Sequence, residues 1–217
     1  MTLLQFKSEA EVELALPKVA AFLERGGVIA YPTETVYGLG CRLNEDDLAR
    51  LSVLTDRPIG KPYLVLVAGE AMIEDCGLSY TDAASRLADR FWPGPLTLVL
   101  SATDSELPNS LRGTGGGIAV RWSSHSNTSR LIEGLGIPIS STSANRTGNE
   151  PLAEVRAIGA EFSGAVESGE LMLLDGGKLA SSSPSTLVDC TGAEPRILRE
   201  GAIPSALVRE YLQEQGY

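Results

Sequence analysis

The chain has 217 residues, 43% of them hydrophobic and 21% charged, which is typical of a globular protein and fits a single domain over residues 1–217. Its formal net charge of −10 argues against tight binding of nucleic acid through phosphates, because proteins of that kind are usually basic. Any anionic ligand must therefore be met by a local concentration of arginine and lysine side chains.

Several other protein classes are excluded by what the sequence lacks. No apolar run approaches the roughly 20 residues that cross a bilayer, and the N-terminus has no signal-peptide pattern, so we expect a cytoplasmic protein without membrane contact. The three cysteines form no CxxC pair and His125 is the sole histidine, which argues against a Cys/His zinc site. No G-x-S-x-G motif accompanies His125, so a Ser-His-Asp hydrolase is not supported.

The first elements are predicted from capping and breaking residues. Ser8 and Glu11 form a capping box that begins a helix, and Pro17 is expected either to restart this helix or to lie in its first turn. A Gly-Gly pair ends the helix, and the apolar residues 28–31 form a buried strand. Asn44 is the expected N-cap of the second helix.

Strands and helices alternate along the rest of the chain. Strands are predicted at residues 63–67, 96–100, 118–122, 137–140, 171–174, 186–188 and 196–198. Further helices are predicted near residues 81–91, 127–134, 151–159 and 205–213. This alternation predicts an α/β fold with a mixed sheet.

Two glycine-rich stretches do not match nucleotide-binding motifs. In residues 112–121 the glycines precede a strand and do not fit G-x-G-x-x-G. The DGGK stretch resembles a P-loop only loosely, because Met172 stands where that motif needs a glycine and Leu179 where it needs serine or threonine.

Six short segments share a pattern that does predict a site. Each joins hydroxyl side chains or an arginine to the end of a predicted strand: PTET at 32–35, RPIGKP at 57–62, AVRW at 119–122, STSAN at 141–145, SPST at 183–186 and LREG at 198–201. Open α/β sheets bind ligands where strand ends meet, so we expect these segments to form one crevice. Its hydroxyl and cationic groups would suit phosphates and a carboxylate.

Each segment taken alone has a simpler interpretation. PTET is compatible with an ordinary turn whose threonines satisfy backbone groups, and Ser143 and Asn145 with an N-cap and an Asx turn. Arg57 and Lys61 are compatible with solvated surface cations. Arg121 is different, because it lies within an apolar strand and must reach either solvent or a buried partner.

Taken in order, the segments resemble a known family. From about residue 18 to residue 203 the chain is similar to the YrdC family of threonylcarbamoyl-AMP synthases, through the successive motifs GGVIAYPTETVYGLG, RPIGKP, WPGPLT, IAVRW, PISSTSAN, PSTLVD and ILREGAI. YPTETVYGLG together with WPGPLT is highly specific. Because the chain ends near residue 217, it resembles the short, single-domain members.

The resemblance implies a twisted mixed parallel/antiparallel sheet flanked by helices, with a deep central cavity. It also implies a nucleotidyltransferase, an L-threonylcarbamoyladenylate synthase that condenses L-threonine, bicarbonate and ATP into threonylcarbamoyl-AMP and pyrophosphate. Mg²⁺ would accompany the ATP. A tRNA-modifying threonylcarbamoyl transferase complex would be the partner, and direct contact with tRNA or other RNA is compatible with this role.

The resemblance also implies roles for single residues. The residues that would bind L-threonine are Thr35, Arg121, Ser141 and Ser185. The residues that would bind ATP are Arg57, Lys61, Ser143, Asn145 and Arg199, with Arg57 and Lys61 catalytic at the phosphates. Thr33 and Glu34 would support the same turn, and no metal ligand from the protein is implied.

One departure from the family pattern keeps a second function open. Where the family has K-x-R before the proline, this chain has Thr55, Asp56 and Arg57, so a lysine is missing and an acid is added. An Asp56 side chain that faced the ligand would weaken phosphate binding. The alternative is therefore a non-catalytic paralogue that binds RNA or a nucleotide, such as a tRNA- or ribosome-associated factor.

Overall fold

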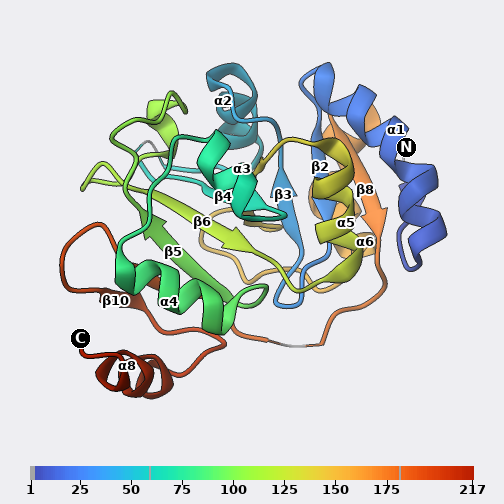
Figure 1. Cartoon of the computed structure of the whole chain (residues 1–217). Coiled ribbons are helices and arrows are strands. Elements are labelled where there is room, and N and C mark those ends of the chain that lie inside the picture. The colour runs from blue at the N-terminus through green and yellow to red at the C-terminus, as the bar shows by residue number, and fades with distance from the viewer. Residues whose placement is uncertain (1–2, 59, 181) are drawn as a thin grey trace.

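The computed structural model describes residues 3–58, 60–180 and 182–217, and in this part the strands form one sheet with the order β1-β8-β2-β3-β7-β4-β6-β5-β9-β10. Figure 1 shows strands of this sheet with helices packed around them. Ile59 of the RPIGKP motif and Ser181 lie outside the described residues. The strands are β1 Leu3–Gln5, β2 Val28–Tyr31, β3 Gly38–Gly40, β4 Leu64–Val67, β5 Leu96–Leu100, β6 Ile118–Trp122, β7 Ile139–Ser143, β8 Leu171–Asp175, β9 Thr186–Asp189 and β10 Arg196–Arg199.

The strands pair in both directions. β8 is parallel to β1 and β2, β4 is parallel to β6, and β5 is parallel to β9, whereas the β2–β3, β3–β7, β4–β7, β5–β6 and β9–β10 pairs are antiparallel. This confirms the predicted α/β fold with a mixed sheet.

Helices flank the sheet and complete the core. They are α1 Glu9–Glu24, α2 Glu45–Leu54, α3 Glu70–Asp75, α4 Asp82–Phe91, α5 Ser126–Leu135, α6 Val155–Glu161, α7 Ser163–Ser168 and α8 Ser205–Glu214, with a short 3₁₀ turn at Asn109–Leu111. None of the helices in the described part of the chain has the length and apolar character needed to cross a lipid bilayer.

The two faces of the sheet bury different side chains, because side chains alternate along each strand. On one face, Ile29 and Tyr31 of β2 and Leu66 of β4 pack in a core with α1 and α5. On the other face, Val28 and Ala30 pack in a larger core with α2, α4, α6, α7 and α8. The helices α1 and α5 leave part of the first face uncovered, and this part holds the site.

The prediction for Pro17 is wrong. The first helix neither restarts there nor begins there, since α1 runs continuously past Pro17 from the Ser8 capping box. Pro17 is exposed, so water can satisfy the carbonyl that proline leaves without a partner. Buried residues on both sides of it, including Val12 and Phe22, hold the helix against the sheet.

Other differences from the predicted elements have equally local causes. The strand predicted at 137–140 begins two residues later, as β7, and includes the polar residues up to Ser143. The sequence did not indicate this part of the strand, because its residues are polar and their hydroxyl side chains line the site. The three-residue strands β1 and β3 were not predicted, since so short a stretch shows no clear periodicity.

Candidate functional site

A cavity of about 380 Å³ lies on the face of the sheet that α1 and α5 serve, beyond the part that they cover. The strand register builds its floor. Leu64 of β4 pairs with Ala119 of β6 and Ser141 of β7, and Thr97 of β5 pairs with Leu187 of β9. All five residues line the cavity, because paired residues present their side chains on one face of a sheet.

The PTET turn between β2 and β3 forms one wall, and the Thr33 hydroxyl holds this turn together. It donates to the carbonyl of Val36 at 2.6 Å and accepts from the N–H groups of Thr35 and Val36, each at 3.2 Å. Thr33 and Thr35 are both buried and both line the cavity. Thr33 therefore has a structural role in this turn. This agrees with the interpretation of PTET as a turn whose threonines satisfy backbone groups.

Arg121 on β6 is 5% exposed and surrounded by acceptors. Its Nη1 and Nη2 each donate to Thr35 Oγ1 at 3.1 Å, and its Nε donates to the carbonyl of Gly94 at 3.3 Å. Nη2 also lies 2.8 Å from Oε1 of Glu34. The arginine within an apolar strand thus reaches buried partners, which is one of the two outcomes expected from the sequence.

Glu34 pairs with Arg121 but is not among the residues that line the cavity. Its carboxylate accepts from the hydroxyl of Ser123 and from the N–H of Ser124, the latter at 3.2 Å. Burial raises the pKa of the Glu34 carboxyl, but the charge of Arg121 and the hydrogen bond from Ser123 outweigh it, so the pKa lies below its ordinary value. Glu34 is therefore an anion at neutral pH.

Arg57 reaches the cavity from the loop between α2 and β4. Its Nη1 donates to Thr142 Oγ1 at 3.0 Å, its Nε donates to the carbonyl of Lys61 at 2.9 Å, and its Nη2 donates to the carbonyl of Pro62. Its Cζ also lies 4.2 Å from the centroid of the Tyr63 ring, in a cation–π contact. These contacts hold Arg57 in one orientation. Burial lowers the pKa of its guanidinium group.

The opposite wall is formed by the start of β9 and the end of β10. Ser185 Oγ lies 2.7 Å from Thr97 Oγ1, and Arg199 Nη2 donates to the carbonyl of Ser185 at 2.9 Å. Burial, and then the neighbouring charge of Arg121, lower the pKa of Arg199. The buried Arg121 and the exposed Arg199 are neighbouring cations that repel each other, which indicates a site made for anions.

Most of the predicted site residues come together in this cavity. Those that line it are Thr33, Thr35, Arg57, Lys61, Arg121, Ser141, Ser143, Ser185 and Arg199. Glu34 and Asn145 are absent from this lining. The amide of Asn145 donates through Nδ2 to the carbonyls of Arg146 and Asn149, each at 2.8 Å, while its buried Oδ1 has no hydrogen-bond partner among the described residues.

The sequence prediction gave no individual role to several residues that line the cavity, although Ala119 and Thr142 lie within two of the segments that it singled out. These include Tyr63, Leu64, Thr97, Ala119, Thr142 and Leu187. The prediction placed the site only at strand ends, whereas the floor crosses the middle of β5, β6 and β9. Alternation of polar and apolar residues along these strands would have indicated a face that is open to a ligand. Leu64 and Ala119 are apolar and lie in apolar runs, so the sequence does not distinguish them from core residues.

The charge of the lining is one-sided. Arg57, Lys61, Arg121 and Arg199 line the cavity, and no aspartate or glutamate does so within the described chain. The described residues also contain no group of three or more His, Cys, Asp or Glu side chains that could hold a metal ion. The arrangement can therefore bind phosphates and a carboxylate through cations and hydroxyl groups.

The departure from the K-x-R pattern does not place an acid in the cavity. Asp56 pairs with Arg146 at 2.8 Å, its side chain is 61% exposed, and it is not part of the lining. Thr55, where the family has lysine, is 2% exposed, and its hydroxyl donates to the carbonyl of Leu51 at 2.7 Å. Position 55 is thus a buried C-cap of α2 in this chain.

Thr55→Lys is expected to lower the free energy of unfolding by about 1–3 kcal/mol, because it removes a buried hydrogen bond and buries an ammonium group. Chemical denaturation of the variant and of the wild-type protein measures this difference. A stability equal to that of the wild type would show that the new ammonium reaches water or the cavity, and the buried environment of Thr55 would then be incorrectly described.

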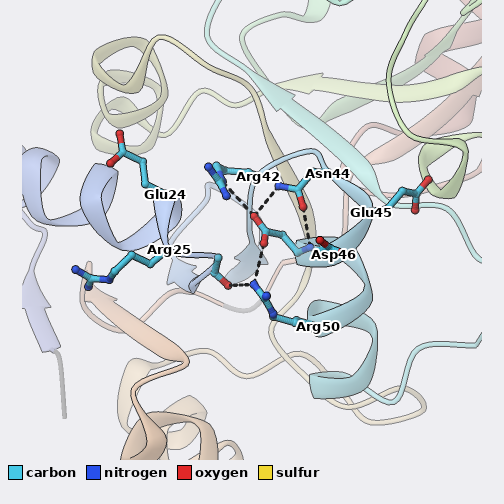
Figure 2. Close-up of a pocket in the computed structure, with 9 residues that line it drawn as sticks. Glu24, Arg25, Arg42, Asn44, Glu45, Asp46 and Arg50 are labelled. Atoms are coloured by element: carbon cyan, nitrogen blue, oxygen red, sulfur yellow. Dashed lines mark hydrogen bonds and ion pairs between the residues drawn. The ribbon is translucent and has the colours of Figure 1, made fainter.

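A second hollow beside the start of α2 is a structural junction. Figure 2 shows Arg42, Asn44 and Arg50 around it, and all three donate to the buried carboxylate of Asp47: Arg42 Nε at 3.1 Å, Asn44 Nδ2 at 2.8 Å and Arg50 Nη1 at 3.0 Å. Arg50 also donates to the carbonyl of Gly26 at 3.3 Å. These contacts join α2 to the turn before β2 and leave the Asp47 carboxylate fully paired.

His125 also has a structural role. Its Nδ1 accepts from the N–H of Thr128 at 3.3 Å and caps α5, while burial lowers its pKa and the nearby Glu34 opposes this effect. A histidine whose ring nitrogen caps a helix is not free to act as the base of a hydrolase triad.

Comparison with known proteins gives consistent matches. The model of the Sua5/YciO/YrdC family, described as "Telomere recombination", matches residues 21–201. The chain is 33% identical over 215 residues to a threonylcarbamoyl-AMP synthase of Pyrococcus abyssi, and the match covers 99% of this chain and 62% of that protein.

Two solved structures share the architecture. The crystal structure of P. abyssi Sua5 complexed with L-threonine has a TM-score of 0.86 and 31% identity, and the match covers 99% of this chain and 62% of that one. E. coli YciO has a TM-score of 0.80 and 25% identity, with 95% of this chain and 97% of that one covered. The chain therefore spans about three fifths of the length of the Pyrococcus relatives and nearly all of YciO.

Proposed function

The chain belongs to the Sua5/YciO/YrdC family, and from this premise we propose that it is an L-threonylcarbamoyladenylate synthase. It would condense L-threonine, bicarbonate and ATP into threonylcarbamoyl-AMP and pyrophosphate. The observation that carries the proposal is a cavity of about 380 Å³ in which hydroxyl groups and four cations, but no carboxylate of the described chain, face the ligand space. An amino acid carboxylate together with a triphosphate matches this charge.

We assign the two ends of the cavity to the two larger substrates. Arg121, Ser141 and Ser185, with Thr35 beside them, are proposed to bind L-threonine. The residues proposed to bind ATP are Arg57, Lys61, Arg199, Ser143 and Asn145, and the unpaired Oδ1 of Asn145 supports a polar ligand near it. In this assignment Arg57 and Lys61 are the catalytic pair at the phosphates.

The proposed reaction has two steps. The threonine amine adds to carbon dioxide, supplied by bicarbonate, and loses a proton to give a carbamate. A carbamate oxygen then attacks the α-phosphorus of ATP, and the bond from this phosphorus to the bridging oxygen of pyrophosphate breaks. Holding the reactants together, and sharing the charge that builds on the pyrophosphate among Arg57, Lys61 and Arg199, are the contributions of the protein.

Mg²⁺ belongs to the proposal as a companion of ATP. The described residues offer no cluster of carboxylate, imidazole or thiol groups for a resident metal. Phosphate and water oxygens are therefore the proposed ligands of Mg²⁺, as is usual for nucleotide-bound magnesium.

The cellular setting is also part of the proposal. A tRNA-modifying threonylcarbamoyl transferase complex would accept the product, in the cytoplasm, from an enzyme that forms a single domain over residues 1–217. Direct contact with tRNA receives less support, because the chain carries a net charge of −10.

The second candidate is a non-catalytic paralogue that binds a nucleotide or RNA in the same cavity. Thr55 in place of the family lysine favours it, because the lining then holds one cation fewer than the family pattern supplies. The ion pair between Asp56 and Arg146 argues against the non-catalytic paralogue, because the added carboxylate points to Arg146 and not to the proposed phosphate site.

A product assay separates the two candidates. The purified protein is incubated with ATP, Mg²⁺, labelled bicarbonate and L-threonine, and pyrophosphate and labelled threonylcarbamoyl-AMP are measured. The synthase proposal predicts that both appear only when L-threonine is present. ATP binding without any threonine-dependent product would favour the non-catalytic paralogue and contradict the synthase.

A further inference from the structure

The end of α2 has the hydrogen bonds of a Schellman motif, and Asp56 occupies its left-handed position. The N–H of Arg57 donates to the carbonyl of Ser52 at 2.9 Å, and the N–H of Asp56 donates to the carbonyl of Val53 at 3.4 Å. The φ angle of Asp56 is +50°, which aspartate and asparagine adopt more readily than most other residues. The chain turns sharply here, so the side chain of Asp56 meets Arg146 while the next residue, Arg57, lines the cavity.

The loop that follows β7 is joined to this end of α2 by hydrogen bonds. Nη1 of Arg146 donates to Oδ2 of Asp56 at 2.8 Å. Thr147 donates to the carbonyl of Thr55 through its N–H at 2.9 Å and through its hydroxyl at 3.2 Å. The loop after α2 and the loop after β7 are therefore held side by side.

Arg146 is held on its other side by the end of α6. Its Nε lies 3.2 Å from Oε1 of Glu161, and its Cζ lies 5.4 Å from the centroid of the buried Phe162 ring. The side chain of Arg146 thus connects the ends of two helices. Neither Arg146 nor Asp56 lines the cavity, so their ion pair does not face the ligand space.

The two joined loops carry groups that the proposed function assigns to ATP. The loop after α2 brings Arg57 and Lys61 to the cavity, and Arg57 also donates to Thr142 of β7 at 3.0 Å. The loop after β7 carries Asn145, whose buried Oδ1 has no hydrogen-bond partner among the described residues. Groups from two loops can meet one nucleotide only if the loops keep a fixed spacing.

We infer that Asp56 and Arg146 are positioning residues for ATP, and that their ion pair sets the spacing of the two loops. The inference rests on the proposed function in one respect, namely that these loops bind ATP. In this role the acid beside Arg57 supports phosphate binding, whereas an acid that faced the ligand would weaken it.

A double-mutant cycle separates positioning from a simple effect of charge. Asp56→Asn removes the carboxylate but keeps a side chain that tolerates a positive φ, and Arg146→Met removes the cation. Calorimetry measures the binding of α,β-methylene-ATP with Mg²⁺, and of L-threonine, to the wild type, both single variants and the double variant. We expect each single variant to bind the ATP analogue roughly 2- to 5-fold more weakly, the double variant to bind it no more weakly than the weaker single variant, and L-threonine binding to be unchanged.

A simple effect of charge predicts a different pattern. Asp56→Asn would then bind the ATP analogue more tightly because it removes an anion, Arg146→Met would bind it more weakly, and the two effects would add. That pattern would overturn the inference, and so would unchanged binding in both single variants. Glu9→Gln and Arg130→Met are the matched controls, expected to bind as the wild type does, because this ion pair joins α1 to α5 and has similar side-chain exposure, 61% and 48%.

A second measurement does not depend on the proposed function. Hydrogen exchange of the ligand-free protein follows the N–H of Thr147, which donates to the carbonyl of Thr55 in the wild type. Exchange at this N–H is expected to be roughly 2- to 5-fold faster in Asp56→Asn and in Arg146→Met, and unchanged in Arg130→Met. Equal rates in the wild type and Asp56→Asn would overturn the inference, whereas faster exchange in the variants of a protein that binds no ATP analogue would contradict only the proposed function.

Discussion

Arg121→Met is expected to weaken the binding of L-threonine by about 2–5 kcal/mol, the cost of removing one partner of a desolvated charge pair. Arg121 is 5% exposed and lines the cavity, so no water molecule can replace its charge at low cost. Equilibrium binding of L-threonine to the wild type and the variant, measured at the same salt concentration, gives the difference directly.

The variant also leaves Glu34 without its cation, so a control for folding is needed. The double variant Arg121→Met/Glu34→Gln removes both charges and is expected to regain stability without regaining L-threonine binding. Arg130→Met is the matched control, because Arg130 is 48% exposed and pairs with Glu9 on the surface. If Arg121→Met bound L-threonine as tightly as the wild type, the carboxylate would have been assigned to the wrong residue.

Arg57→Met is expected to lower turnover by about 10²–10³-fold, the usual effect of losing one group that stabilises developing charge. Arg57 is held toward the cavity by Thr142, by two backbone carbonyls and by the Tyr63 ring, so its charge is already in place when pyrophosphate leaves. The rate of pyrophosphate release at saturating ATP measures the effect.

Arg57→Lys tests whether charge alone is sufficient. Lysine keeps the charge but cannot make the fork of hydrogen bonds that orients Arg57, so only part of the rate is expected to return. The matched control is Arg86→Met, since Arg86 lies on α4 and donates to Gln215 on the surface. Full activity in Arg57→Met would exclude Arg57 from the proposed catalytic pair.

The parts of the fold that the sequence predicted are those set by local chemistry. The Ser8 capping box and the Asn44 N-cap begin α1 and α2 at the predicted residues, because each cap uses hydrogen bonds within one turn. The continuous apolar runs at these positions form β2, β5 and β6, because an apolar run of strand length is recognisable from neighbouring residues alone. The passage of α1 through Pro17 was not predictable in this way, since it depends on packing against the sheet.

The site shows the same division. Motifs that combine hydroxyl groups with arginines identified nine residues of the cavity lining, including the buried Arg121. The motifs could not identify Thr97 or Leu187, because these residues join the site only through the β5–β9 register. The sequence also did not show that Glu34 pairs with Arg121. This contact joins the β2–β3 turn to β6, and the two residues are far apart in the chain.

A crystal structure of the protein with L-threonine and a non-hydrolysable ATP analogue tests the central claim most directly, namely that one cavity on the sheet holds both substrates. The account predicts the threonine carboxylate within hydrogen-bond distance of Arg121, and the triphosphate against Arg57 and Lys61. Either ligand bound on another face of the molecule, or a triphosphate at Arg121, would contradict it.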